Sequence, residues 1–485
     1  MSTKNESSPP LLNKFPVELS PPFTTPKANM PVVLVPESEI VLMREGKKYF
    51  QGIGHIALEW LPRPAIRFHA KSSRANIDIL PDKCQLISNE LGRPLVAQIT
   101  DQQISTETVS VKGFVRDDVL PHGMEISAAS FSLPNFKADL GKPVRDAIGR
   151  SSRRARSEFK AEGWIITLDE VRDFDEEIEL RDELDKSGGY GITHTGYIHR
   201  IDKSTFKAKE LLSLKDDLFW FFSFCRGFKT GPLLIQLYGK DNTDRFLNLS
   251  FPIIEPWQER ILWLNELEVG SLASIFKGYL RRVHKPIWTK PIRSAIHWYL
   301  AMHAQAGAIQ GAIIFGQTAL ELLGWTGLVD DEKLISSDGY EKLPAADKIR
   351  LLLFSCGIPL EIPKSLVNLD KTARAENWKD TAQCIAEIRN ALVHPSTKKQ
   401  GKLDRVTFPA IVDAWRLCLW NLELVLLCLF DYKGNYVNRL GPGQWRGEKI
   451  QQVPWAKEEA NKGCRLSQKK EDEDMASHDK KMVKS

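Results

Sequence analysis

The chain has 485 residues, more than one hydrophobic core usually serves, which excludes a single small domain. Hydrophobic residues make up 42% and charged residues 27%, and these ordinary values exclude a collagen-like, wholly disordered or membrane-embedded chain. Lysine and arginine outnumber aspartate and glutamate by 67 to 62, a surplus too small to indicate a nucleic-acid partner by itself.

The cysteines and the start of the chain indicate the cellular compartment in which the protein works. Seven cysteines, an odd number without a C-x-x-C pair, are typical of reduced thiols and support neither a disulfide framework nor a zinc site. The first ten residues lack the apolar segment of a secretory signal. The most hydrophobic window, 411–430, is interrupted by Asp413, Arg416, Asn421 and Glu423, so we expect a buried helix. These features predict a cytoplasmic protein without a role in a membrane.

Two segments are expected before the helical part. Residues 1–35 are rich in proline, serine, threonine and lysine without apolar periodicity, and they predict a disordered arm. Residues 36–285 predict a β-rich sensor or binding region, either one domain or two subdomains divided near 137–160. Short apolar runs with β-branched residues predict its strands: Ile40–Met43, Ala65–Phe68, Ile77–Leu80, Leu95–Ile99, Val109–Val115, Trp164–Leu168, Gly191–Arg200 and Leu233–Tyr238. A helix is expected at Asp216–Cys225.

Opposite charges follow one another in the middle of this region. Residues 142–160 are rich in arginine, and residues 169–185 are strongly acidic. The simplest interpretation is two solvated faces or loops that attract each other. The alternative is a basic strip that binds phosphate groups, for which Arg150, Arg153 and Arg154 are the candidates.

After residue 286 the pattern changes to helical spacing. Apolar residues from Ile292 to Leu323 predict one long helix, or two broken near Gly307, with Gly324 as the terminator. Further helices are expected at 345–356, 371–393 and 408–429, so residues 286–432 predict a helical bundle. Residues 433–485 predict a charged and largely disordered tail. The fold class is therefore α+β and multidomain, with a β-rich N-terminal region followed by an all-α bundle.

Several motif matches fail in their context. Residues 52–57 (GIGHIA) fit the dinucleotide fingerprint, but the preceding segment is too polar for a buried parallel strand, so a turn is expected. The glycines of Ser187–Gly191 predict a hairpin turn. The aromatic stretch Phe219–Phe224 is expected to be core rather than a base-stacking surface. His297 and His303 are six residues apart and do not share a helix face as a metal pair would.

The informative segment is Cys384–Pro395. Arginine and a following histidine recur at similar spacing in three places: Arg63 with His69, Arg116 with His122, and Arg389 with His394. The first two pairs contain a proline and lie in the strand-rich region, whereas the third ends an amphipathic helix. Arg389 lies four residues after Ile385 and three before Leu392, so it falls along the apolar stripe and needs an anionic partner or a ligand.

The end of this helix is set by His394, which directly precedes Pro395. A residue before proline disfavours the α conformation, so the helix is expected to stop there. The exposed carbonyl groups at a helix C-terminus favour a protonated imidazole. Asn390 adds an amide donor and acceptor beside the pair.

Arg389, Asn390 and His394, together with Ala319–Leu323 on an earlier helix, resemble the HEPN superfamily, in particular the HEPN domains of ApeA-type abortive-infection proteins. The resemblance covers roughly residues 286–432, and the β-rich region ahead of it is only loosely similar to ApeA-type proteins. The resemblance implies a bundle that dimerises, so that two Arg–His pairs meet in one cleft and cut RNA without a metal or other cofactor.

The residues fit that implied chemistry. RNA carries its own nucleophile, the 2′-hydroxyl, so a site needs proton transfer and charge stabilisation. His394 would act as general base or acid, and Arg389 would stabilise the charge that builds on the scissile phosphate. Asn390 would orient the phosphate or the histidine.

Three further residues are weaker candidates. Glu321, four residues after Gln317 on the expected facing helix, would position Arg389 or serve a polar role in the cleft. The alternative is that it is an ordinary exposed helix residue. Lys285 and Arg293 would add to a basic lining that binds phosphate groups.

We therefore expect a HEPN-type, metal-independent endoribonuclease that acts in anti-phage defence (abortive infection) or as a toxin. Its substrate would be RNA, and it would form a homodimer through the bundle. The β-rich region would be a sensor for an unknown trigger. Alternatively, Arg389 pairs with a carboxylate and His394 caps the helix, which leaves a bundle without catalysis. Such a bundle would be a nucleotide- or protein-binding module, or a scaffold that dimerises.

Overall fold

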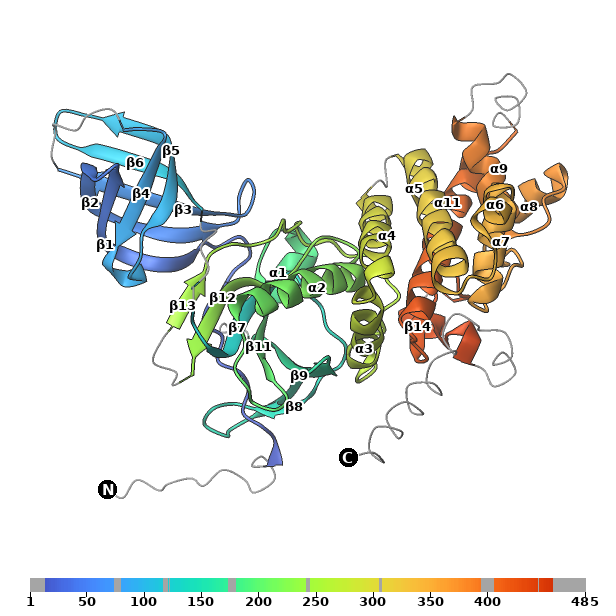
Figure 1. Cartoon of the computed structure of the whole chain (residues 1–485), viewed down its shortest axis with the longest axis horizontal. Helices are drawn as coiled ribbons and strands as arrows, with labels where there is room; N and C mark the ends of the chain where they lie inside the picture. The colour runs from blue at the N-terminus through green and yellow to red at the C-terminus, as the bar shows by residue number, and fades with distance from the viewer. Residues whose placement is uncertain are drawn as a thin grey trace. The chain divides into compact units, whose positions relative to one another are not determined.

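The computed structural model describes residues 14–73, 80–116, 121, 123–172, 180–240, 245–304, 308–393, 405–443 and 445–456. The chain forms two compact units, one of Met1–Phe222 with Lys229–Glu259 and one of Ser223–Phe228 with Arg260–Ser485. The first unit contains a barrel and a sheet, and the second is mainly helical, so the fold is α+β and multidomain as predicted (Figure 1). The boundary falls at residue 260 rather than at the expected 285, because helix α3 (Ser271–Val283) packs on helices of the second unit.

The first part of the N-terminal unit is a closed six-stranded antiparallel barrel. Its strands are β1 (Val32–Arg44), β2 (Lys47–Glu59), β3 (Ala65–Ser72), β4 (Lys83–Ser88), β5 (Leu95–Ile104) and β6 (Val109–Arg116), with a 3-10 turn η2 at Asn89–Leu91. The strand order is β1-β2-β3-β6-β5-β4, and β1 pairs with β4 to close the barrel. A methyl group at Gly52 or Gly54 would overlap backbone oxygens of β3, so glycine lets these two strands bend closely together.

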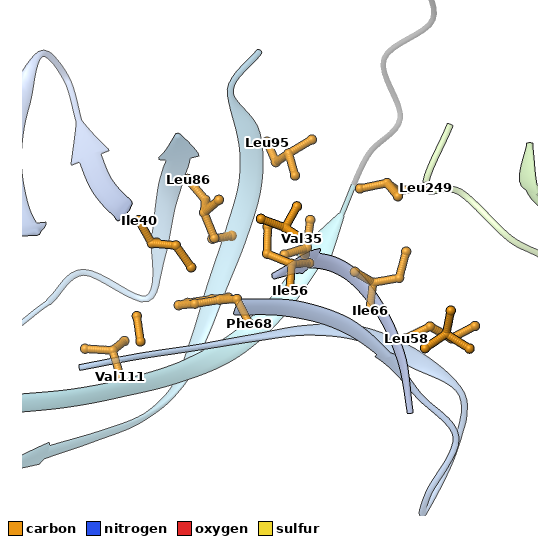
Figure 2. Packing of buried hydrophobic residues seen from close by; sticks show 14 of the residues in the cluster. Val35, Ile40, Ile56, Leu58, Ile66, Phe68, Leu86, Leu95, Val111 and Leu249 are labelled. Atoms are coloured by element: carbon orange, nitrogen blue, oxygen red, sulfur yellow. The ribbon is translucent and has the colours of Figure 1, made fainter. Parts of the chain in front are cut away.

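The barrel core comes from residues that alternate along each strand. Ile56, Phe68 and Leu86 point inward and have no exposed surface, and Figure 2 shows them among the aliphatic side chains of the neighbouring strands. This alternation is what one buried face of a sheet requires. The segment 52–57 lies within β2, so the expected turn is wrong, and most of the predicted strand 77–80 lies outside the described residues.

The rest of this unit is a seven-stranded antiparallel sheet. Its strands are β7 (Ile126–Pro134), β8 (Lys142–Arg145), β9 (Ser152–Ala161), β10 (Trp164–Glu170), β11 (Ile192–Arg200), β12 (Leu233–Gly239) and β13 (Arg245–Asn248), in the order β13-β12-β7-β11-β10-β9-β8. The helices of this region are α1 (Leu180–Ser187) and α2 (Ala208–Arg226). Phe222 of α2 packs edge-on against Phe136, with 4.9 Å between the ring centroids. The predicted helix and its role as core are therefore confirmed for this part of the aromatic stretch.

The segment before the barrel is folded onto this sheet. Val17 forms a bridge with Arg145, and the backbone N–H of Leu19 donates to Asp169 Oδ2 at 2.8 Å. The Thr25 hydroxyl accepts from the backbone N–H of Ile192 at 3.1 Å. The expectation of a disordered arm over 1–35 is therefore wrong from residue 14 onward, because backbone and polar contacts hold a segment that has no apolar periodicity. Residues 1–13 lie outside the described residues.

The second unit is a helical bundle with short additions after it. Besides α3 it contains α4 (Pro286–Ala304), α5 (Ile309–Trp325), a π-helical turn η3 (Thr326–Asp331), α6 (Ser337–Glu341), α7 (Ala345–Ser355), α8 (Val367–Glu376), α9 (Thr381–Val393), α11 (Phe408–Leu429), β14 (Asn435–Val437), β15 (Ile450–Gln452) and the short turns η4 (Arg446–Lys449) and η5 (Pro454–Ala456). The two strands pair with each other, so the expected disordered tail is wrong for 433–456. Residues 457–485 lie outside the described residues.

Three helix boundaries differ from the prediction or refine it. The long apolar segment is broken between α4 and α5, which is the two-helix alternative. Gly324 does not end α5, because the chain continues into η3 and the Tyr340 hydroxyl packs where a side chain at residue 324 would lie. The predicted helix 371–393 is two helices, because Asn377 adopts a left-handed conformation with φ of 57° and ends α8.

Hydropathy singles out one helical segment of the bundle. Among the described residues, one segment, Ile309–Asp331, is long and apolar enough to cross a membrane by length and composition. However, 61% of its most apolar window is buried inside the unit, which is typical of a core helix. The window 411–430 lies mainly in α11, where the apolar residues are buried as predicted.

Glycine at position 278 is required for the packing of α3. A methyl group there would overlap the backbone carbonyl of Phe430, whereas one at Gly311 of α5 would meet nothing within 4 Å. Gly278→Ala should therefore destabilise the bundle by about 1–3 kcal/mol. Gly311→Ala should be neutral or stabilise it by up to about 1 kcal/mol, because alanine has the higher helix propensity. Thermal unfolding of both purified variants checks this, and equal shifts in melting temperature would contradict the packing.

Candidate functional site

The predicted site lies at the C-terminal end of α9. This helix packs against α5, α7 and α11, and Ile385, Ile388 and Ala391 form its buried face. Its start is fixed by the Asp380 carboxylate, which accepts the backbone N–H of Gln383 at 2.9 Å. The described part of the helix extends to Val393, and the expected stop before Pro395 stays a prediction. His394 itself lies outside the described residues.

Arg389 occupies the partly buried position that the helical spacing predicts. Its Nη1 donates to Asn390 Oδ1 at 3.4 Å, and its Nε is buried without a hydrogen-bond partner. Among the residues that the structure describes, no carboxylate forms an ion pair with it. A buried guanidinium nitrogen without a partner is unfavourable, because it has lost water and gained nothing in return. Arg389 therefore meets the condition for a ligand-binding cation.

Glu321 lies on α5, which packs against α9 as the facing helix. Its carboxylate accepts a hydrogen bond of 2.6 Å from Gln317 Nε2, and its backbone oxygen accepts a long one of 3.5 Å from the Tyr340 hydroxyl. Burial, and secondly the charge of Glu321, raise the pKa of Tyr340 well above its usual value. No hydrogen bond or ion pair between described atoms joins Glu321 to Arg389. Glu321 is therefore half-buried and engaged with Gln317, rather than an exposed residue or a direct partner of Arg389.

Buried polar atoms without partners occur on all three helices of this part of the bundle. Gln317 is 1% exposed on α5, and its Oε1 has no partner. Asn421 is fully buried on α11, and neither atom of its amide has a partner. Helices α5, α9 and α11 pack against one another, and each carries one of these residues, Gln317, Arg389 and Asn421. The sequence analysis assigned no role to Asn421, although an amide within an otherwise leucine-rich helix is a usable signal.

The remaining predicted cations in the bundle are not free at this site. Lys285 lies 3.8 Å from Asp331, which also pairs with Arg282 at 3.1 Å and accepts the Trp288 indole N–H at 2.8 Å. Arg293 is half-buried on α4. The Lys285 ammonium group therefore lies near an acid that also pairs with Arg282, and the predicted basic lining stays a prediction.

The basic strip of the N-terminal unit divides into two kinds of residue. Arg153 pairs with Glu18 at 3.2 Å and also donates to the backbone oxygen of Glu170. Arg150 and Arg154 are exposed. The solvated, ion-paired interpretation therefore holds for Arg153, because part of the predicted arm folds back and supplies the acidic partner.

A second polar cluster in the bundle is centred on the buried Glu423 carboxylate. The buried Glu423 carboxylate accepts hydrogen bonds from Arg439 Nε at 2.8 Å and from the Tyr299 hydroxyl at 2.7 Å. His303 packs edge-on against Tyr299, with 4.7 Å between the ring centroids. Part of His303 is exposed, but its Nε2 is buried. The pKa of His303 is lowered well below its usual value, mainly by burial and secondly by the charges of Arg439 and Arg260.

Metal binding finds no support in this part of the molecule. Within the ranges that the structure describes, no group of three or more histidine, cysteine, aspartate or glutamate side chains is placed to hold a metal ion. His297 is exposed, and His303 belongs to the cluster around Tyr299.

Two arginines of the bundle, Arg439 and Arg389, should respond in opposite ways to the same substitution. Arg439→Met leaves Glu423 buried and unpaired, which should cost about 3–5 kcal/mol. Arg389→Met removes a partly buried charge that has no described partner, so the melting temperature should stay the same or rise. Thermal unfolding measures both. An equal loss of stability in Arg389→Met would mean that Arg389 has a structural anionic partner.

His303 predicts a dependence of stability on pH. Because its pKa is lowered in the folded state, the unfolded state binds the proton more readily. Stability should be complete above about pH 7 and fall by up to about 1.4 kcal/mol per pH unit below about 6.5. His303→Gln should flatten the stability profile between about pH 7 and pH 5, whereas His297→Gln on the exposed face of α4 should not. Denaturant unfolding at several pH values provides the measurement.

Two family models match the chain, and both ranges follow the structure. Residues 122–260 match the YopA central domain, which spans the seven-stranded sheet, and residues 285–451 match the YopA C-terminal domain, which spans α4 to β15. The chain is 28% identical over 406 residues to the "SPbeta prophage-derived uncharacterized protein YopA" of Bacillus subtilis (strain 168). That similarity covers 81% of this chain and 88% of the relative. No solved structure matches the chain. The chain is thus similar to YopA along most of its length, and the barrel lies outside both matched domains.

Proposed function

We propose that the helical unit is a HEPN-type endoribonuclease that works without a metal ion, with Arg389 and His394 as its catalytic residues. The observation that carries the proposal is Arg389: its guanidinium is partly buried, its Nε has no hydrogen-bond partner and no described carboxylate neutralises it. A phosphodiester is an anion of the size and charge that such a group binds. Asn390 beside it adds donors for a phosphate oxygen.

The chemistry balances with groups that the chain and the RNA supply. The 2′-hydroxyl attacks the neighbouring phosphorus, the bond from phosphorus to the 5′-oxygen breaks, and a 2′,3′-cyclic phosphate and a 5′-hydroxyl remain. One histidine takes the proton of the 2′-hydroxyl, and a second returns a proton to the leaving oxygen. Arg389 stabilises the extra negative charge on the phosphate during the step. Because one chain has one such histidine at this place, the site is completed by the same helix end of a second copy.

The biological setting we propose is anti-phage defence or toxicity in the cytoplasm. The similar protein YopA of Bacillus subtilis is described as prophage-derived, which is a phage-related setting. The sequence resemblance to ApeA-type abortive-infection proteins supports the same setting. The N-terminal unit would then sense the trigger that releases the nuclease.

Cleavage of RNA by the purified protein tests the proposal. Wild type incubated with single-stranded RNA in EDTA should yield products with cyclic phosphate and 5′-hydroxyl ends. Arg389→Ala and His394→Ala should each lower the rate by about 100-fold or more. Asn390→Ala should have a smaller effect, because it orients rather than transfers a proton. Arg374→Ala is the matched control, because Arg374 is 80% exposed on α8 and pairs with Asp370.

The same variants separate the alternatives. Cells that express wild type should grow more slowly and lose intact RNA, and the His394→Ala variant should remove both effects. If wild type leaves RNA intact in vitro and in cells, while Arg389→Ala weakens nucleotide binding, the bundle is a binding module without catalysis. If neither substitution changes cleavage, binding or growth, the bundle is a scaffold.

A further inference from the structure

The barrel carries an outward face that the proposed nuclease does not use. Strands β3 and β6 alternate without exception between buried residues and residues that face solvent. The outward side chains on β3 are Arg67, His69 and Lys71, and those on β6 include Lys112 and Phe114. The two strands pair directly, so these side chains form one continuous surface in the middle of the sheet.

Cations and flat rings are interleaved on this face by the strand register. Arg67 pairs with Phe114, and its guanidinium lies over the phenyl ring at 5.1 Å from the centroid. In the next row, His69 pairs with Lys112 on one side and with His55 of β2 on the other. The two imidazole rings are stacked, with centroids 5.2 Å apart and planes within 11°.

The face is also basic. Strands β3 and β6 together carry four lysine and arginine residues, Arg67, Lys71, Lys112 and Arg116, and neither strand contains an acidic residue. Glu59, at the end of β2, accepts from Arg67 at 3.2 Å and contacts His69 Nε2 at 2.6 Å. This carboxylate holds one arginine and one ring in place and leaves the two lysines exposed.

The spacing of the rows suits a polymer of stacked bases and phosphates. Outward residues on one strand repeat about every 6.6 Å, and neighbouring strands lie about 4.8 Å apart. Proteins that bind single strands combine a positive track for the backbone with ring platforms for the bases. A duplex hides its base faces, so it would use the charges of such a surface but not its rings.

We propose that the outer face of β2, β3 and β6 binds single-stranded nucleic acid, with Lys71 and Lys112 contacting phosphates and with His55, His69 and Phe114 stacking on bases. This inference does not depend on cleavage by the helical unit, because the residues belong to the other unit and bind rather than react. It assigns a ligand class to the N-terminal unit.

Binding of a labelled oligouridine to the full-length protein tests the proposal. A 2′-O-methyl oligomer of about 12 nucleotides is the probe, because the site sizes of single-strand binding folds are of this order and the blocked 2′-oxygen prevents cleavage. Fluorescence anisotropy at several salt concentrations gives the affinity and its salt dependence. The double variant Lys71→Ser/Lys112→Ser should weaken binding and reduce the slope of log Kd against log salt by about 1.4.

Two further variants separate stacking from charge. Phe114→Leu keeps an apolar side chain at the position and should weaken binding about fivefold or more without a change in the salt slope. His69→Gln keeps a polar group beside Glu59 and removes the ring, with the same expected result. The matched control is Lys47→Ser/Lys48→Ser, which removes the same charge from exposed positions at the start of β2, seven residues or more before His55.

Each outcome decides the proposal. Loss of affinity in the face variants with the control unchanged supports it. It is overturned if wild type does not bind the probe at low salt, if the control pair weakens binding as much as the test pair, or if a duplex of the same length binds as tightly as the single strand. Cleavage by Arg389→Ala is measured separately, so failure of the nuclease and failure of this face give different results.

Discussion

A guanidinium that is taken partly out of water needs an anion, and this constraint organises the helical unit. Among the arginines of the bundle, Arg439 and Arg389 differ in whether an acid within the chain pairs with them. Arg439 is held by Glu423, which also accepts from Tyr299, so the cluster is closed. Arg389 has an amide neighbour, a buried Nε without a partner and no described carboxylate. The two arginines therefore differ in the presence of a buried acid beside them.

The helices around Arg389 repeat this incomplete pairing. Gln317 on α5 uses its amide nitrogen on Glu321 and leaves its oxygen without a partner, and Asn421 on α11 leaves both atoms without one. Native proteins rarely retain such groups in a packed interior unless they bind water or a ligand.

The N-terminal unit contributes a different kind of surface. The barrel, which lies outside both matched YopA domains, places rings and cations on the same outer strands, whereas the seven-stranded sheet uses its aromatic residues for packing against α2. If one unit binds single-stranded nucleic acid and the other cleaves phosphodiesters, as proposed, the chain itself links the bound substrate to the catalytic residues. Linkage of this kind raises the effective concentration of the substrate without new contacts at the reacting atoms.

The sequence by itself determined the fold class, the position of most helices and the place of Arg389, because these follow from periodicity. It did not reveal that Asp331 lies near Lys285, that Glu18 reaches Arg153, or that the chain is ordered from residue 14, since each depends on residues far apart in sequence that the fold brings together. The same holds for the barrel face, where the pairing of β3 with β6 sets rings beside cations that lie about forty residues apart in the chain. Local pattern decides which face of an element is buried. Only the tertiary structure decides which charged group has a partner within the chain and which has none.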